Sequence, residues 1–187
     1  MPRVKGRVRD IRIYGDPVLR EKAQPVKEID EQVLQLIADL VETMLVKDGL
    51  GLAANQIGEL RSVIALNPKG VSIDQPPFAL VNPELVAASG EVEREEGCLS
   101  LPGISEVLAR PARVKVRGLG SKGKEIEVSA EGTLARALLH EIDHLNGVMF
   151  VDHLPPARRK LLKGKLDDLK RVGAQGAGRH QKAEAGS

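Results

Sequence analysis

Two histidines and a carboxylate lie within one five-residue segment, His140-Glu141-Ile142-Asp143-His144. Residues four apart on a helix lie on the same face, with Cβ atoms about 5–6 Å apart. The two imidazoles can therefore converge on one cation, and Glu141 can reach a water molecule bound to it. The segment predicts a metal site, although so short a pattern also arises by chance, and a pair of satisfied helix histidines is the alternative.

A catalytic divalent metal site typically takes three protein ligands and leaves one position open, so this segment needs a partner elsewhere in the chain. The candidate is Cys98, the only cysteine, which follows Gly97, a residue that permits close backbone approach. The alternative is a small buried hydrophobe, the usual fate of a lone intracellular cysteine. A third motif, Gly49-Leu50-Gly51-Leu52-Ala53-Ala54-Asn55-Gln56, precedes both. Three motifs in this order favour a functional site over coincidence.

Helices and strands must position these motifs. Asp30 is a candidate N-cap for a helix over 31–47 with apolar residues at helical spacing. A second helix over 132–146 carries both histidines and ends at Gly147, and a third runs from Pro155–Pro156 to about Val172. Strands are predicted at Ser62–Leu66, Phe78–Asn82, Val107–Val116 and Glu125–Val128. The expected fold class is α+β, with antiparallel strands packed around a central metal-binding helix, and with a C-terminal helix.

Composition limits the functional classes. The chain has 187 residues, 42% hydrophobic and 29% charged, as expected for one globular domain. A net charge of +2 is too small to argue for DNA or another nucleic acid as substrate. One cysteine cannot form an internal disulfide, and no stretch approaches the ~20 apolar residues of a membrane span. With no signal-peptide core near the start, the expected compartment is the cytoplasm.

One glycine-rich segment imitates a nucleotide-binding motif. Residues 118–124 read Gly-Leu-Gly-Ser-Lys-Gly-Lys, which fits a dinucleotide fingerprint and nearly fits a phosphate-binding loop. Both chemistries need a helix N-terminus directly after the glycines. Because a strand-like pattern follows, and position 125 is Glu instead of Ser or Thr, we predict a hairpin turn here.

The three motifs together resemble the signatures of the bacterial peptide deformylases. That family carries a Gly-x-Gly-x-Ala-Ala-x-Gln loop, a Glu-Gly-Cys-x-Ser strand and a His-Glu-x-Asp-His helix. This chain has them in order as Gly49–Gln56, Glu96–Ser100 and His140–His144. The likeness runs from about Asp10 through Pro155, so residues 1–172 are expected to form a single catalytic domain. Residues 173–187, rich in Gly, Ala and charge, are expected to be a disordered tail.

The resemblance implies an activity, which is removal of the N-formyl group from the N-terminal methionine of nascent polypeptides. It implies that Cys98, His140 and His144 bind one divalent metal ion and that Glu141 is the general acid/base. A hydroxide bound to the metal would attack the formyl carbon. The resemblance assigns the stabilisation of the oxyanion to the Gln56 side chain and the Leu99 backbone N–H. The backbones of Gly49, Gly51 and Gly97 are expected to pair with the peptide by strand addition.

The metal and the partners follow from the same resemblance. Fe²⁺ is favoured, while Zn²⁺, Ni²⁺ and Co²⁺ also suit a Cys-His-His set. The C-terminal helix is strongly basic, which is either a solvated face or a surface that docks on the ribosome. Its basic residues are Arg158, Arg159, Lys160, Lys163, Lys165, Lys170 and Arg171. Two other functions stay open: a zinc peptidase, and a catalytically dead homologue that binds ribosomes or peptides.

Several positions near the motifs have two interpretations. Leu139 stands where the family normally has Gln, and we expect a change in packing there. Arg136 shares the ligand face of the helix; either its head reaches water, or it borders the pocket for the methionine side chain. Asp143 is expected to orient a neighbour or to pair with an arginine. Glu96 is expected to support the pocket from behind, while Glu95 is solvated.

Overall fold

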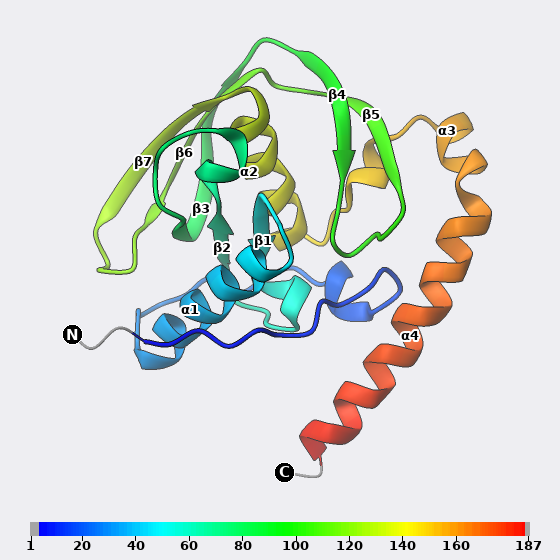
Figure 1. The fold of residues 1–187 in the computed structure, drawn as a ribbon, viewed down its shortest axis with the longest axis horizontal. Coiled ribbons are helices and arrows are strands. Elements are labelled where there is room, and N and C mark those ends of the chain that lie inside the picture. The colour runs from blue at the N-terminus through cyan, green and yellow to red at the C-terminus, as the bar shows by residue number, and fades with distance from the viewer. Residues whose placement is uncertain (1–3, 186–187) are drawn as a thin grey trace.

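The computed structural model describes residues 4–185, and the side chains of residues 4–177. It is an α+β fold in which antiparallel strands surround a central helix, as the sequence predicts (Figure 1). The α-helices are α1 (Glu31–Val46), α2 (Gly132–Leu145), α3 (Pro156–Leu161) and α4 (Lys163–Ala185). The strands are β1 (Gly51–Ala53), β2 (Val63–Leu66), β3 (Phe78–Ser89), β4 (Val92–Gly97), β5 (Ser105–Arg110), β6 (Arg113–Leu119) and β7 (Glu125–Glu131). No helix among residues 4–185 is long and apolar enough to cross a membrane.

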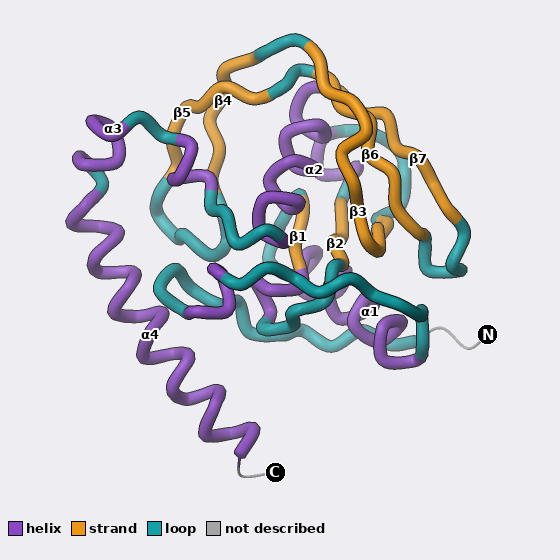
Figure 2. Tube along the Cα trace, turned by 180° about the vertical axis from the view of Figure 1, so that it is seen from behind, coloured by secondary structure: helices purple, strands orange, loops and turns teal. Residues whose placement is uncertain are grey.

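The main sheet has the strand order β1-β2-β3-β6-β7, and every neighbouring pair is antiparallel. Helix α2 packs on one face of this sheet and α1 packs on the other face of its β1–β2–β3 part (Figure 2). Side chains alternate between the faces of a strand. In β2, therefore, Ile64 and Leu66 join the cluster under α2, while Val63 and Ala65 join the cluster under α1. Burial of both faces explains why β2 is a continuous apolar run.

A second, two-stranded sheet places the cysteine motif beside α2. The paired strands β3 and β6 continue past Gly90 and Pro111 into the pair β4–β5, which bends over toward the helix (Figure 1). Gly90 has φ +68°, a left-handed conformation that glycine adopts without strain. Proline lacks a backbone N–H and interrupts a ladder. The single strand predicted over Val107–Val116 is therefore wrong, because Pro111 divides it into β5 and β6.

Helix α1 begins as its sequence predicts. The Asp30 carboxylate accepts a hydrogen bond of 2.8 Å from the Val33 backbone N–H, which satisfies one free donor of the first turn. Its buried apolar residues face β1 and β2, while Asp39 and Thr43 are buried polar exceptions that hold the N-terminal segment. The segment at 118–124 is the β6–β7 turn, so the hairpin prediction is confirmed.

The C-terminal part differs from the sequence prediction. One helix from Pro155–Pro156 to about Val172 and a disordered tail from Gly173 were expected. The structure instead has two helices, because α3 ends at Leu161, and α4 begins at Lys163 and continues to Ala185. Gly173 is buried against the backbone of residues 13–16, and Ala177 is also buried. Composition alone pointed to disorder, whereas packing against the loop stabilises the helix beyond residue 172. Residues 186 and 187 of the predicted tail lie outside the described residues.

Candidate metal centre

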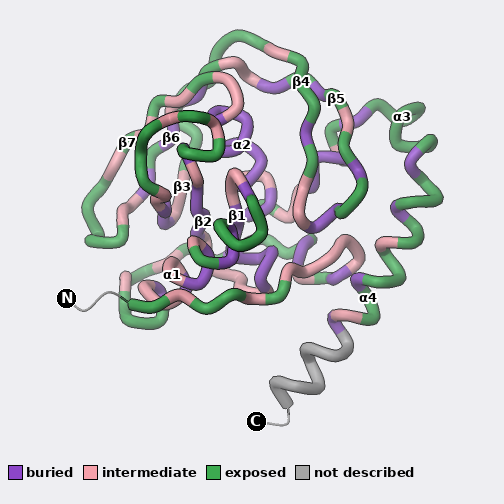
Figure 3. Tube along the Cα trace, in the orientation of Figure 1, coloured by how far each residue is buried: buried purple, intermediate pink, exposed green. Residues whose placement is uncertain are grey.

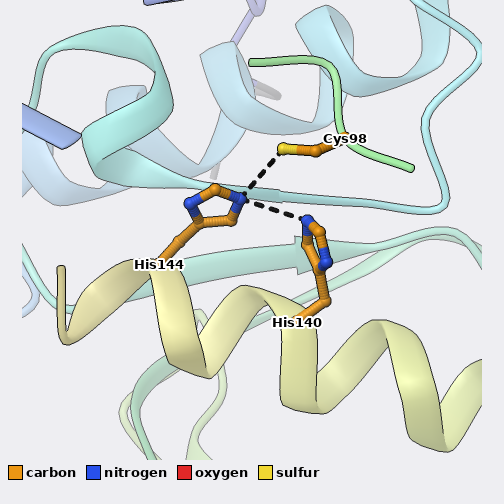
Figure 4. A group of neighbouring side chains, drawn as sticks. All are labelled: Cys98, His140 and His144. Carbon is orange, nitrogen blue, oxygen red and sulfur yellow. Dashed lines mark hydrogen bonds between the residues drawn. The ribbon is translucent and has the colours of Figure 1, made fainter. Parts of the chain in front are cut away.

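Three candidate ligands from two parts of the fold meet at one point (Figure 4). His140 and His144 project from α2, and Cys98 follows β4 directly. The ligand atoms of all three lie within 4.8 Å of one another. The Nε2 atoms of His140 and His144 are 3.1 Å apart, and Cys98 Sγ lies 3.2 Å from His144 Nε2.

These residues fit a divalent metal ion. Metal–nitrogen bonds of about 2.0–2.1 Å at tetrahedral angles place two ligand nitrogens roughly 3.3 Å apart, close to the spacing seen here. Both histidines are buried, and among the described residues neither Nε2 has a carboxylate partner that would otherwise explain its position. A thiolate and two imidazoles suit several divalent transition metals, so the donor set does not select one of them.

Glu96 fixes the orientation of His140. Its Oε1 lies 2.6 Å from His140 Nδ1, which leaves Nε2 directed at the centre. Burial alone would raise the pKa of Glu96, but hydrogen bonds from His140 and Arg110 outweigh it and hold that pKa well below its usual range. A carboxylate behind the imidazole is the common outer support of a metal-binding histidine. The expectation that Glu96 supports the site from behind therefore agrees with its contacts.

Glu141 lies in the same helix turn, with only 4% of its surface exposed. Its Oε2 is buried and has no hydrogen-bond partner among the described residues. Burial raises the pKa of Glu141 to about 7, since a charged carboxylate loses its hydration there. Gly51 leaves room for this side chain: a Cβ added at Gly51 would lie 2.5 Å from Glu141 Oε1. The carboxyl group is thus poised to take up or release a proton near neutral pH.

Gln56 is oriented by its own hydrogen bonds. Its Oε1 accepts from the Ala53 backbone N–H at 2.9 Å, so the amide nitrogen must point the other way. That nitrogen donates to Ser100 Oγ at 3.2 Å and lies 3.6 Å from Cys98 Sγ. An N–H donor is therefore held beside the candidate ligands. Ser100, which the sequence interpretation left without a role, positions it.

A cavity of about 530 Å³ is lined by two of the three candidate ligands, Cys98 and His140. Its walls contain most of the predicted site residues, brought together from β1, the end of β4 and α2. They are Gly49, Gly51, Gln56, Gly97, Cys98, Leu99, His140 and Glu141. His144 is not among the lining residues, and its ring faces Cys98 and His140 (Figure 4). The walls of the cavity also include Leu101, Ile104, Thr133 and Ala137, which the sequence interpretation did not single out. A signal was available for Thr133 and Ala137, because they precede His140 by seven and three residues on the ligand face of α2.

The structure contradicts one of the two interpretations that the sequence allowed for Arg136. The prediction that its head reaches water is wrong, because only 5% of the residue is exposed. Its Nη1 donates to Glu96 Oε2 at 2.9 Å and its Nη2 donates to the Val92 carbonyl at 2.9 Å. Its Nε is buried and has no partner among the described residues. Arg136 lines the cavity, as the other interpretation requires.

The remaining neighbours behave as their positions suggest. Leu139 is buried in the core cluster between α2 and the main sheet, which agrees with a packing role. Asp143 accepts from Arg110 Nη1 at 2.6 Å, so its pairing with an arginine is confirmed. Glu95 is exposed and accepts from Ser105 Oγ at 2.6 Å.

Figure 3 shows the buried stretch of α2 at the centre of the molecule, with the more exposed β4–β5 pair beside it.

Comparisons with known proteins identify similar sequences and structures over most of the chain. A family model described as polypeptide deformylase matches residues 8–160. A curated relative named peptide deformylase, from Syntrophobacter fumaroxidans, is 47% identical over 156 residues, which cover 83% of this chain and 92% of the relative. Another, from Thermodesulfovibrio yellowstonii, is 44% identical over 161 residues, 86% of this chain and 98% of the relative. The crystal structure of a peptide deformylase from Legionella pneumophila superposes with a TM-score of 0.81 at 42% identity, covering 90% of this chain and 98% of that one.

Proposed function

The chain belongs to the peptide deformylase family, and from this premise we propose how its own residues carry out the reaction. As a member it is a metal-dependent hydrolase that removes the formyl group from N-formylmethionyl peptides. The observation that supports the proposal most strongly is the meeting of Cys98, His140 and His144 beside a cavity that Cys98, His140 and Glu141 line.

Cys98, His140 and His144 would hold the metal ion. When bound, a divalent ion supplies Lewis acidity, which activates water at neutral pH. Glu96 keeps the ring of His140 in a fixed orientation through its 2.6 Å contact with Nδ1. The family resemblance favours iron(II), and the ligand set is equally compatible with zinc, nickel or cobalt.

Glu141 acts as the acid/base. Its buried carboxyl group, with a pKa of about 7, takes a proton from the attacking water at Oε2, which has no hydrogen-bond partner within the described part of the chain. It then returns that proton to the leaving amine. Such proton transfer by a positioned group typically contributes 10²–10⁴-fold, as an order of magnitude.

Gln56 and Leu99 stabilise the charge that develops on the formyl oxygen. The Gln56 amide nitrogen is held beside Cys98 by the Ala53 N–H on its other side. Leu99, which follows Cys98 in the chain, also lines the cavity. Losing one such donor typically costs about 3–4 kcal/mol of transition-state stabilisation.

The peptide lies along glycine backbone on both sides of the cavity. β1 is an edge strand of the main sheet; Gly51 begins it, and Gly49 lies two residues before it. Gly97 ends β4 and lines the same cavity. Backbone groups at these edges pair with an extended chain without reading its side chains, which predicts weak sequence preference beyond the first residue.

Formate release from formyl-Met-Ala-Ser by anaerobically purified protein tests this proposal, with metal content measured on the same sample. Glu141→Gln keeps the shape of the side chain and is expected to lower kcat by 10²–10⁴-fold as an order of magnitude, with metal still bound. Absence of formate from a folded, metal-loaded wild-type protein would instead support the binding-module alternative. A peptidase would cleave the peptide bond and release no formate.

We also propose that the protein docks on the ribosome. This docking would place the protein in the cytosol. The exposed basic residues of α3 and α4 supply the charge. Arg158, Arg159 and Lys163 are less informative targets, because they pair with Glu106, Asp152 and Asp167. Reversing Lys160, Lys165 and Lys170 to Glu should weaken co-sedimentation with ribosomes and flatten its salt dependence; unchanged co-sedimentation would refute the docking.

A further inference from the structure

A continuous path of polar contacts runs from His140 toward the protein surface. His140 Nδ1 lies 2.6 Å from Glu96 Oε1. Arg110 donates hydrogen bonds to both oxygens of that carboxylate, with Nη2 2.7 Å from Oε1 and Nε 3.1 Å from Oε2. Bidentate contacts of this kind fix the relative orientation of the two groups as well as their distance. The orientation of His140 therefore depends on where Arg110 is held.

The path continues through Asp143 to His153. Arg110 Nη1 lies 2.6 Å from Asp143 Oδ2, and His153 Nε2 lies 2.7 Å from the same oxygen. The exposed fraction of the side chains rises along the path, from 7% for Arg110 to 23% for Asp143 and 39% for His153. His153 closes the 3₁₀ helix Phe150–His153, which follows α2. The last member of the path is thus accessible from solvent.

The contacts define what His153 contributes. Its Nε2 lies 2.7 Å from Asp143 Oδ2, and an ionised carboxylate has no hydrogen to donate, so Nε2 carries the hydrogen and donates to Asp143. The Arg110 guanidinium, with Nη1 3.3 Å from Nε2, has no acceptor and does not compete for that hydrogen. Asp143 Oδ2 is consequently held between two donors, and removing one leaves it freer to rotate or to take up water. Arg110 would then lose its fixed contact on the side away from Glu96.

We propose that His153 is a positioning residue for the metal centre, acting through Asp143, Arg110 and Glu96 on the ring of His140. The inference rests on the proposed role of His140 as a ligand. Direct outer partners of a ligand typically change metal affinity or activity by 10–100-fold. Because His153 acts through three intervening side chains, its loss is expected to speed metal release by a smaller factor, about 3–10-fold.

The first test compares His153→Ala with His153→Gln. Glutamine retains an N–H donor at a similar reach, so it should restore the contact with Asp143, whereas alanine removes it. The readouts are the rate at which metal-loaded protein releases its ion to a chelator, and the visible absorption of the cobalt-substituted protein. We expect faster release and a shifted spectrum for His153→Ala, and values within about twofold of wild type for His153→Gln. Arg158→Ala is the matched control, because it removes an exposed pair with Glu106 that lies off this path.

A double-mutant cycle tests the route. If His153 acts through Asp143, then His153→Ala should have little further effect in an Asp143→Asn background, and the two effects should not add. Additive effects, or a release rate and spectrum unchanged by His153→Ala, would overturn the proposal. Metal release is measured without reference to formate, so a protein that binds metal but releases no formate refutes the proposed function and still tests His153.

Discussion

At the scale of single residues, Gly51 shows how closely the cavity fits its acid/base. A Cβ at this position would lie 2.5 Å from Glu141 Oε1 and 2.7 Å from its Cγ, well inside contact distance. Gly51→Ala should therefore displace the Glu141 carboxyl group and lower kcat at least 10-fold, since a displacement of about 1 Å can cost 10²-fold.

The control for this prediction is Gly120→Ala in the β6–β7 turn. Its Cβ would meet its nearest neighbour at an ordinary 3.7 Å, so formate release should stay near the wild-type rate. Equal rates for the two variants would contradict the steric argument at Gly51.

Arg136 is the other residue whose burial matters for the reaction. It places a cationic side chain, held by Glu96 and the Val92 carbonyl, in the wall of the cavity. If this wall takes the methionine side chain, Arg136→Ile should change kcat/KM for formyl-Met-Ala-Ser several-fold, on the order of 1 kcal/mol. The two hydrogen bonds from Arg110 to Glu96 do not involve Arg136, so they should remain in that variant.

Steady-state kinetics on formyl-Met-Ala-Ser measures the effect, and metal content on the same sample excludes loss of the ion as its cause. An unchanged kcat/KM would show that Arg136 does not border the methionine pocket.

At the scale of elements, α4 is attached to the rest of the molecule through close backbone contacts. A Cβ at Gly173 would lie 2.3 Å from the Tyr14 carbonyl oxygen and 2.4 Å from that of Ile13. Gly173→Ala should thus destabilise the protein by about 1–3 kcal/mol, as overpacking does. Gly176, one turn later, has nothing within 4 Å of such a Cβ.

Gly176→Ala is therefore the matched control, and it should stabilise α4 by up to about 1 kcal/mol through helix propensity. Urea unfolding of both variants measures the difference. The same sign of change for the two would mean that α4 does not pack on the loop at residues 13–16.

The N-terminal segment is held to α1 by a buried carboxylate. Asp39 accepts from the Arg7 backbone N–H at 2.9 Å, from Gln35 at 2.7 Å and from Arg9 at 3.1 Å. Burial would raise the pKa of Asp39, but these hydrogen bonds outweigh it and lower that pKa below its usual value. A carboxyl group whose pKa is lower in the folded state stabilises the protein fully above its unfolded pKa of about 3.9.

This stabilisation is lost as the pH falls from about 4 through the lower pKa of the folded state. Asp39→Asn should therefore be less stable than wild type at neutral pH, and the difference between the two should shrink in acid. Urea midpoints as a function of pH measure it; because both proteins lose metal alike in acid, that loss cancels in the difference. A difference independent of pH would contradict the assignment.

At the scale of the whole molecule, the candidate ligands join two parts of the fold. Cys98 belongs to the end of the β4–β5 pair, and the two histidines belong to the helix that packs on the main sheet. An ion bound by all three would therefore act as a cross-link between the two sheets. Binding to the folded state alone stabilises it by about 2.7 kcal/mol when the free ligand is 100 times its Kd.

Removal of the metal by a chelator should consequently lower the melting temperature. Amide hydrogen exchange should rise first in β4 and β5, which pair only with each other. A Cys98→Ser variant that keeps the wild-type melting temperature and exchange pattern in the presence of metal would contradict this role of the centre.

The sequence by itself determined what depends on neighbours along the chain. Helical periodicity places His140 and His144 on one face, and Asp30 caps α1 for purely local reasons. The family and the α+β class also followed from the motifs and are confirmed. The ligand and catalytic roles stay predictions that formate release and metal content test.

Tertiary structure alone decided what depends on contacts between distant segments. Arg136 is buried because Glu96, 40 residues away in sequence, supplies its partner. Asp143 joins Arg110 to His153, a contact that no spacing rule reveals. Helix α4 persists past Val172 because Gly173 fits against the loop at residues 13–16. In each case a charged or flexible residue has a local preference for solvent or disorder, and the free energy of a specific long-range contact outweighs it.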